Sequence, residues 1–261
     1  MDSSLWVAKT GLDAQQRRMT VVANNLANVN TTGFKRDRAV FEDLLYQTIR
    51  QPGAQIGQGA NSPTGLVIGT GTRVAATEKI HSQGNMIQTD NALDLAIDGN
   101  GFLQTLRSDG TIGYTRDGSL KLNNIGQLVT SSGNLLQPAV SIPNNARSIT
   151  IGKDGTVSVQ TFDQPADQVV GNIQIASFVN PAGLQATGGN NYVETAASGQ
   201  AEVLTPSQNG AGRLIQGSLE ASNVNVVESM VNMIETQRAY EVNSKAIAAA
   251  DGMLRFINNN L

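Results

Sequence analysis

The 261-residue sequence predicts an α+β fold in which long N- and C-terminal helices pair as a coiled coil, with a central antiparallel β domain and an extended arm. Three observations support this prediction. Apolar residues recur at intervals of seven at both chain ends, turn dipeptides crowd the middle, and a Gly/Pro/Gln-rich stretch lies between them. The predicted parts are an N-terminal coiled-coil helix (1–31), a connecting segment (32–90) with an arm at 46–72, a β-rich body (91–190), a return connection (191–222) and a C-terminal coiled-coil helix (223–261).

The N-terminal helix is predicted from a heptad row. Leu5, Leu12, Met19 and Leu26 recur every seven residues, and Val22 lies in the companion row of the same face. A helix of about 28 residues would be roughly 42 Å long.

The C-terminal helix shows the same pattern, and Asn223 or Asn225 can cap its start. About 35 residues would give a helix of roughly 50 Å. Its predicted heptad row is Val226, Met233, Tyr240, Ile247 and Leu254.

Between the helices, Asn-Gly and Asp-Gly pairs recur at the spacing of short strands joined by tight turns. This pattern predicts a small, twisted antiparallel β domain. The expected strands are 93–97, 102–106, 112–115, 120–122, 128–130, 149–151, 156–159, 169–178 and 192–194.

Residues 51–63 are rich in Gly, Pro and Gln and have almost no apolar content. Such a composition predicts a linker or an extended arm rather than a core element.

Neither terminal helix can bury its apolar row alone. The rows must pair with each other, with copies from other chains, or with both. These residues alone leave an internal core and an assembly surface equally favoured, and two rows that need partners favour an oligomer.

The composition excludes several kinds of chemistry. With no Cys and a single His, the chain cannot form a disulfide, a thiol nucleophile or a Cys/His zinc site by itself, and no cofactor is predicted. Asp94, Asp98 and Asn100 lack the spacing of a calcium loop and are better explained as turn residues. We expect His81 to be solvent-exposed or hydrogen-bonded. A pair of glycosidase-type carboxylates stays open, although no aromatic cluster accompanies it.

The net charge of −3 argues against nucleic acid as a partner. The densest basic group is Lys35, Arg36 and Arg38, which Asp37 interrupts, and we interpret it as a solvated segment. No apolar run reaches the length of a membrane span, so no membrane insertion is predicted. The N-terminus does not resemble a cleaved secretory signal, and export by a route without one stays open.

Five segments closely resemble the bacterial flagellar rod and hook axial protein family. The most specific is residues 23–35, ANNLANVNTTGFK, and the others are 94–102, 114–118, 223–228 and 233–243. The resemblance covers nearly the whole chain. Its signature residues here are Asn24, Asn25, Leu26, Asn28, Asn30, Thr31, Gly33 and Phe34.

Within this family, the length and residues 41–55 are most similar to the members that build the distal rod. Hook members and proximal rod members are the alternatives, and a periplasmic cell-wall enzyme is a remote one. The resemblance implies a stiffening arm that includes Tyr46, Gln47, Arg50, Gln51, Pro52 and Gly53. Phe41 and Leu45 resemble the Phe-x-x-x-apolar signal of flagellar export substrates, for which helix packing is the alternative explanation.

The resemblance also implies a function. The chain would be a non-enzymatic subunit that self-assembles into a helical tube, with paired terminal helices inside and the β body outside. The tube would transmit torque across the periplasm to the hook and enclose the export channel. The implied partners are further copies, proximal rod proteins, the hook protein, the L and P rings, the type III export apparatus and a rod or hook cap.

Overall fold

The computed structural model describes residues 3–52, 55–57, 60–61, 63–162 and 166–259, and it is an α+β fold with a helix near each chain end. The chain forms two compact units. The helical unit comprises Met1–Ala27, Asp37–Lys79 and Asn225–Leu261, and the β unit comprises Asn28–Arg36 and Ile80–Val224. The coarse fold prediction is therefore confirmed.

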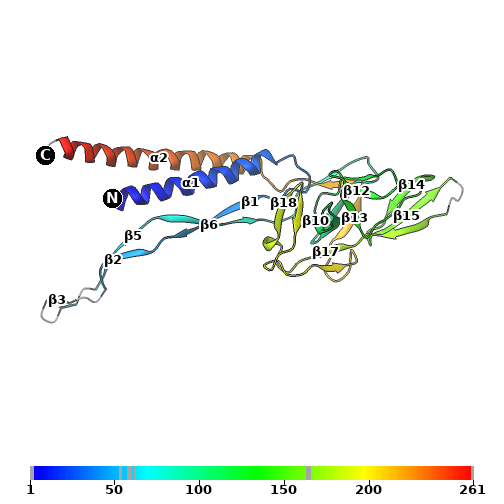
Figure 1. The fold of residues 1–261 in the computed structure, drawn as a ribbon, viewed down its shortest axis with the longest axis horizontal. Helices are drawn as coiled ribbons and strands as arrows, with labels where there is room; N and C mark the ends of the chain where they lie inside the picture. Colours follow the sequence, from blue (N-terminus) through cyan, green and yellow to red (C-terminus); the bar gives the residue numbers. More distant parts are fainter. Residues whose placement is uncertain (1–2, 53–54, 58–59, 62, 163–165, 260–261) are drawn as a thin grey trace. The chain divides into compact units, whose positions relative to one another are not determined.

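The helical unit contains α1 (Ser3–Ala27) and α2 (Val226–Asn259), which contact each other and run antiparallel (Figure 1). Asn225 caps α2, because its Oδ1 accepts the backbone N–H groups of Val227 and Glu228 at 3.0 and 3.3 Å. Asn223, the other predicted cap, has a different role that is described below.

Three antiparallel strand pairs complete the helical unit (Figure 1). β1 and β6 pair along seven residues of β1, and both contact α1. Two of these pairs lie within the predicted arm, whose composition does not indicate strand pairing. The pairs are β1 (Asp37–Asp43) with β6 (Thr72–Lys79), β2 (Tyr46–Arg50) with β5 (Leu66–Gly69), and β3 (Gln55–Gly57) with β4 (Ala60–Asn61).

The β unit is built on a nine-stranded antiparallel sheet. Four of its strands, at 102–106, 112–115, 120–122 and 128–130, have the predicted bounds. The predicted strand 169–178 is instead two strands in two sheets, β16 (Gln168–Asn172) and β17 (Ile175–Ser177). The large sheet consists of β9 (Phe102–Leu106), β10 (Ile112–Thr115), β11 (Leu120–Leu122), β12 (Leu128–Thr130), β13 (Leu135–Gln137), β17, β18 (Gln185–Gly188), β19 (Asn191–Val193) and β20 (Glu202–Leu204).

Smaller sheets flank this one. A three-stranded sheet contains β16, and two further pairs use strands from the segment expected to form a return connection. A short 3₁₀ helix spans Pro181–Gly183. The remaining strands are β14 (Ala146–Ile151) with β15 (Thr156–Thr161), β8 (Leu95–Asp98) with β21 (Arg213–Gln216), and β7 (Met86–Gln88) with β22 (Ser218–Glu220).

Two hydrophobic clusters form the core of the β unit. An aliphatic cluster is centred on residues such as Leu95, Leu103 and Ile175, which are almost fully buried. An aromatic cluster gathers Phe102, Tyr114, Phe178 and Tyr192, with the rings of Tyr114 and Phe178 edge-to-face at 4.8 Å. Burial and the nearby Glu194 carboxylate raise the pKa of Tyr114 to about 12. Four of the chain's eleven Phe, Tyr and Trp residues thus meet in this cluster.

Candidate functional site

The contact between α1 and α2 includes several small and polar residues. Thr236 and Ala250 are buried, and Asn243 lies so close to Gly11 that a Cβ there would be 3.0 Å from the Asn243 Nδ2. Arg18 donates a hydrogen bond from Nη2 to the Asn232 Oδ1 at 3.3 Å. Small side chains let the two backbones approach closely, whereas larger apolar ones would hold them apart.

The predicted heptad rows lie only partly on this contact. On α1, Val22 is buried, and Leu5, Leu12, Met19 and Leu26 are half-buried. On α2, Met233 and Ile247 are half-buried, but Val226, Tyr240 and Leu254 are exposed. Another row spaced by seven contains the buried Thr236 and Ala250 and the half-buried Ser229 and Asn243. A search for large apolar residues does not find this row, because its members are small or polar.

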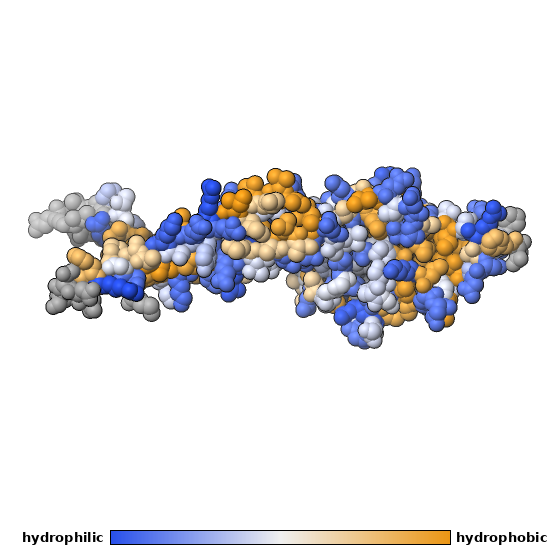
Figure 2. All heavy atoms as spheres, turned by 90° about the horizontal axis from the view of Figure 1, so that it is seen from above, coloured by the Kyte–Doolittle hydropathy of each residue, from blue (hydrophilic) through white to orange (hydrophobic). Residues whose placement is uncertain are grey.

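A second face of α2 leaves large apolar side chains in solvent. Val227 is 71% exposed, and its neighbours at helical spacing are about half exposed. Figure 2, which views the molecule from above, shows hydrophobic surface gathered over the helices. We call Val226, Val227, Met230, Val231 and Ile234 the α2 apolar stripe. A contiguous apolar surface of this kind marks an interaction site.

The signature residues at the end of α1 form local hydrogen bonds. The Asn25 side-chain amide donates to the Asp37 carbonyl and accepts the Asp37 N–H, each at 2.8 Å. Thr31 donates from Oγ1 to the Asn28 Oδ1 at 3.2 Å. Leu26 and Phe34 are half-buried, and Asn24 and Asn30 are exposed. The two hydrogen bonds between Asn25 and Asp37 fix the direction that the backbone takes after α1.

Gly33 is the signature residue with the strictest requirement. Its φ of 68° is in the left-handed region, and a Cβ would lie 2.7 Å from the Arg116 carbonyl carbon. Its N–H donates to the Glu220 carbonyl at 2.8 Å. Thr32, the preceding residue, accepts a hydrogen bond on its carbonyl from Asn190 at 3.0 Å. The segment after α1 is therefore bound tightly to the β unit to which it belongs.

Behind Gly33 lies a buried ionic triad, defined as Lys35, Arg116 and Glu220. The Lys35 Nζ is 2.6 Å from the Glu220 Oε1, and the Arg116 Nε is 3.0 Å from the Glu220 Oε2. The side chain of Lys35 is 1% exposed, so its interpretation as a solvated residue is wrong. Glu220 offsets part of the cost of burying this ammonium group far from water. Arg38 is exposed, as that interpretation expected.

Burial lowers the pKa of Lys35, and the Glu220 carboxylate opposes this shift. Burial likewise lowers the pKa of Arg116, again against Glu220. Asn223 joins the same region, because its Oδ1 accepts the Arg36 N–H at 2.7 Å and its Nδ2 donates to the Ile80 carbonyl at 2.7 Å. The triad and the Asn223 side chain connect segments near the two ends of the chain. Lys35 and Glu220 are 185 residues apart, so no local sequence pattern indicates that they meet.

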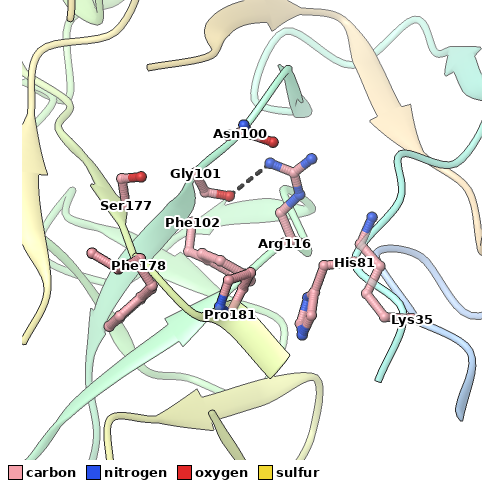
Figure 3. Close-up of a pocket in the computed structure, with 10 residues that line it drawn as sticks. Lys35, His81, Asn100, Gly101, Phe102, Arg116, Ser177, Phe178 and Pro181 are labelled. Carbon is pink, nitrogen blue, oxygen red and sulfur yellow. Dashed lines mark hydrogen bonds between the residues drawn. The ribbon is translucent and has the colours of Figure 1, made fainter. Parts of the chain in front are cut away.

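A cavity of about 200 Å³ adjoins the triad. The Arg116 guanidinium lies over it and donates to the Gly101 carbonyl at 2.6 Å (Figure 3). His81 also lines the cavity, and its ring packs edge-on against Phe102 and Tyr192 at 5.6 and 5.7 Å. His81 is thus part of the aromatic cluster.

The predicted arm and export residues lie on β1, β2 and the segments beside them. Phe41 belongs to β1, so helix packing does not explain this residue, and Leu45 is 89% exposed. Tyr46, Gln47, Arg50, Gln51 and Pro52 are exposed, and Gly53 lies outside the described residues. Opposite β2, Leu66, Val67 and Ile68 also expose apolar side chains. The β2–β5 pair therefore presents apolar surface to solvent.

In the described part of the chain, no group of three or more His, Asp and Glu side chains could hold a metal ion. None of its helices is long and apolar enough to cross a membrane.

Three family models match the chain. They are the flagella basal body rod protein model at residues 5–35, the flagellar hook protein FlgE/F/G D1 domain at residues 96–159, and the flagellar basal body rod FlgEFG protein C-terminal model at residues 215–260. These names are those of structural components rather than enzymes.

The chain also matches whole relatives. It is 54% identical to the flagellar basal-body rod protein FlgG of Buchnera aphidicola subsp. Schizaphis graminum over 98% of each chain. The FlgG of Borreliella burgdorferi is 48% identical, over 99% of this chain and 98% of that one. The FlgG of Bacillus subtilis is 39% identical over 98% of each. With such identity over nearly its full length, the chain belongs to the flagellar basal-body rod protein FlgG family.

Proposed function

We propose that this chain is a structural subunit of the flagellar distal rod. It self-assembles into a stiff helical tube that transmits motor torque across the periplasm to the hook and encloses the export channel. The α2 apolar stripe is the observation that carries this proposal. Small and polar residues such as Thr236 and Asn243 lie at the contact between the helices, and the large apolar side chains of the stripe are left for neighbouring subunits.

In the assembled tube, α1 and α2 would form a coiled coil lining the channel. The half-buried residues of the two predicted rows would complete their burial against helices of other copies. Burying one large apolar side chain fully stabilises by about 1.5–3 kcal/mol. Five stripe residues repeated on every subunit would therefore supply much of the energy of assembly.

The arm would stiffen the tube by contacting a neighbouring subunit. Support comes from the β2–β5 pair, which is held by cross-strand hydrogen bonds yet exposes Tyr46, Ile49 and Val67. A paired ribbon resists bending better than an unpaired chain, and its apolar face gives it a surface with which to bind.

The proposed binding partners and export route of the subunit follow from its place in the rod. The subunit would meet proximal rod proteins and the hook protein along the axis, and the L and P rings around it. It would reach the growing end through the type III export apparatus, with Phe41 and Leu45 as part of the export signal, and would assemble beneath a rod or hook cap.

One substitution in the stripe tests the assembly proposal. Val231→Asp places a charge at the centre of the apolar surface, so we expect purified subunits to stay unassembled where the parent chain forms tubes in electron micrographs. Val231→Leu keeps the surface apolar and should assemble. Equal assembly of both variants would contradict the proposal, provided that circular dichroism shows equal helix content.

A deletion of residues 46–69 tests the arm. It removes β2 and β5 but leaves the β1–β6 pair, whose ends would be joined by a short turn. We expect tubes that form and are curved or flexible. Straight, stiff tubes would rule out a stiffening role for the arm while leaving the assembly proposal intact.

A further inference from the structure

The β unit buries two cations beside one cavity. Lys35 and Arg116 line the cavity of about 200 Å³ together with His81, and Phe102, Phe178 and Pro181 form much of the rest of its wall (Figure 3). In the figure, Lys35 and His81 lie across the cavity from Phe178. The cavity thus has a cationic side and an aromatic side.

The charges beside the cavity do not balance. Lys35 and Arg116 carry two positive charges, and Glu220 is the one carboxylate among the described residues that forms an ion pair with either. One positive charge is left over in a region where both cations are at least nine-tenths buried. A buried charge without a partner is strongly unfavourable, so an anion entering this cavity would gain a large electrostatic stabilisation.

Both cations retain hydrogen-bond donors for such an anion. An ammonium group has three protons, and Lys35 uses two of them, toward the Ser82 carbonyl and Glu220. A guanidinium group has five, and Arg116 donates hydrogen bonds to the Gly99 and Gly101 carbonyls while its Nε faces the Glu220 Oε2 in an ion pair. These bonds also fix both side chains in place, so binding would cost little side-chain entropy.

The size and lining of the cavity limit what can enter. Drug-sized ligands occupy pockets of about 300–1,000 Å³, so this one fits a single side chain or a small acid. We propose that the cavity binds a carboxylate on a short apolar stem, with its oxygens toward Lys35 and Arg116 and its stem against Phe102 and Phe178. An acidic side chain of another polypeptide and a free small acid share this chemistry.

Thermal unfolding of the full chain in sodium butyrate tests the proposal, with sodium chloride of equal ionic strength as reference. Butyrate at about ten times its Kd should raise the Tm of the β unit by about 3–6 °C over chloride. Butylammonium chloride, with the same stem and the opposite charge, should give no rise.

Three variants locate the effect. Lys35→Met keeps the stem and removes the charge, so the butyrate shift should disappear. Ser177→Leu fills the cavity without replacing a triad residue, so the butyrate shift should also disappear, which keeps the test valid if Lys35→Met folds poorly. Lys121→Met is the matched control, because this exposed lysine lies in the same unit on β11, and its shift should equal that of the parent chain.

Tube assembly in butyrate distinguishes the two sources once binding is measured. Slower assembly identifies an acidic side chain of a neighbouring copy, and unchanged assembly identifies a free acid; either result is consistent with the pocket. Equal Tm values in butyrate and chloride for the parent chain, or a full butyrate shift in both Lys35→Met and Ser177→Leu, would overturn the proposal.

Discussion

The two units distribute polar and apolar residues in opposite ways. The β unit buries large aliphatic side chains such as Leu103, and it buries charge in the ion pairs of Glu220 with Lys35 and Arg116. The helical unit places Thr236 and Asn243 at its internal contact and leaves Val227 and Ile234 in solvent. The first distribution is that of a domain stable alone, and the second is that of a surface prepared for other chains.

This difference means that one substitution should have different consequences in the two units. A large apolar residue contributes to the stability of the single chain in the β unit, whereas on α2 it contributes to assembly. Substitutions that preserve or break this division are therefore the sharpest tests of it.

The largest effect is expected at the ionic triad. Glu220→Gln removes the carboxylate and leaves Lys35 and Arg116 buried without a counter-charge, so unfolding should be easier by about 3–5 kcal/mol. Urea unfolding monitored by the near-ultraviolet signal of the aromatic cluster measures this. A cost under about 1 kcal/mol would show that water or another group compensates the cations.

A pair of leucines tests the division directly. Leu103 is fully buried in the aliphatic cluster, so Leu103→Ala should cost about 2–5 kcal/mol in the free subunit. Leu254 on α2 is about half exposed, so Leu254→Ala should change the stability of the free subunit by less than about 1 kcal/mol and weaken tube assembly instead. Equal costs in the free subunit would contradict the comparison.

A smaller effect is expected where α1 ends. Asn25→Ala removes two hydrogen bonds to the Asp37 backbone and leaves the Asp37 N–H and carbonyl without these partners. We therefore expect the free energy of unfolding to fall by about 1–3 kcal/mol. Far-ultraviolet circular dichroism during urea unfolding reports it. Asn30→Ala, at an exposed signature position, is the control and should be nearly neutral.

The smallest effect is expected at an exposed ion pair. Arg73 Nη2 lies 3.0 Å from the Glu42 Oε2 across β6 and β1, with both side chains more than half exposed. Arg73→Met should shift the free energy of unfolding by less than about 1 kcal/mol, and high salt should erase the difference. A larger, salt-independent loss would show that the strand pair depends on this contact.

Much of the fold followed from local patterns. The strands at 102–106, 112–115, 120–122 and 128–130 were predicted with their observed bounds, because glycine-containing turn sequences such as Asn100-Gly101 and Ser132-Gly133 mark both ends of each short strand. Strands such as β2 and β5 were missed, since exposed strands without a turn signal are recognised only by their distant partners.

The candidate site was predicted less well than the fold. The sequence analysis identified both helices as surfaces that need partners, and it singled out the signature around Gly33. It placed Lys35 in solvent, because a basic residue between polar ones is usually solvated. Nothing in the sequence near Lys35 indicates that a carboxylate 185 residues away lies 2.6 Å from its ammonium group.

By itself, the sequence determined the α+β class, both terminal helices, the turn-rich sheet and the family resemblance, because these depend on periodicity and motifs read along the chain. Only the tertiary structure decided which heptad row of α2 faces α1, how the arm strands pair, and that Lys35, Arg116 and Glu220 share one buried site. The physical reason is that helix facing depends on side-chain volume as well as hydrophobicity, and that strand pairing and charge pairing join residues far apart in sequence.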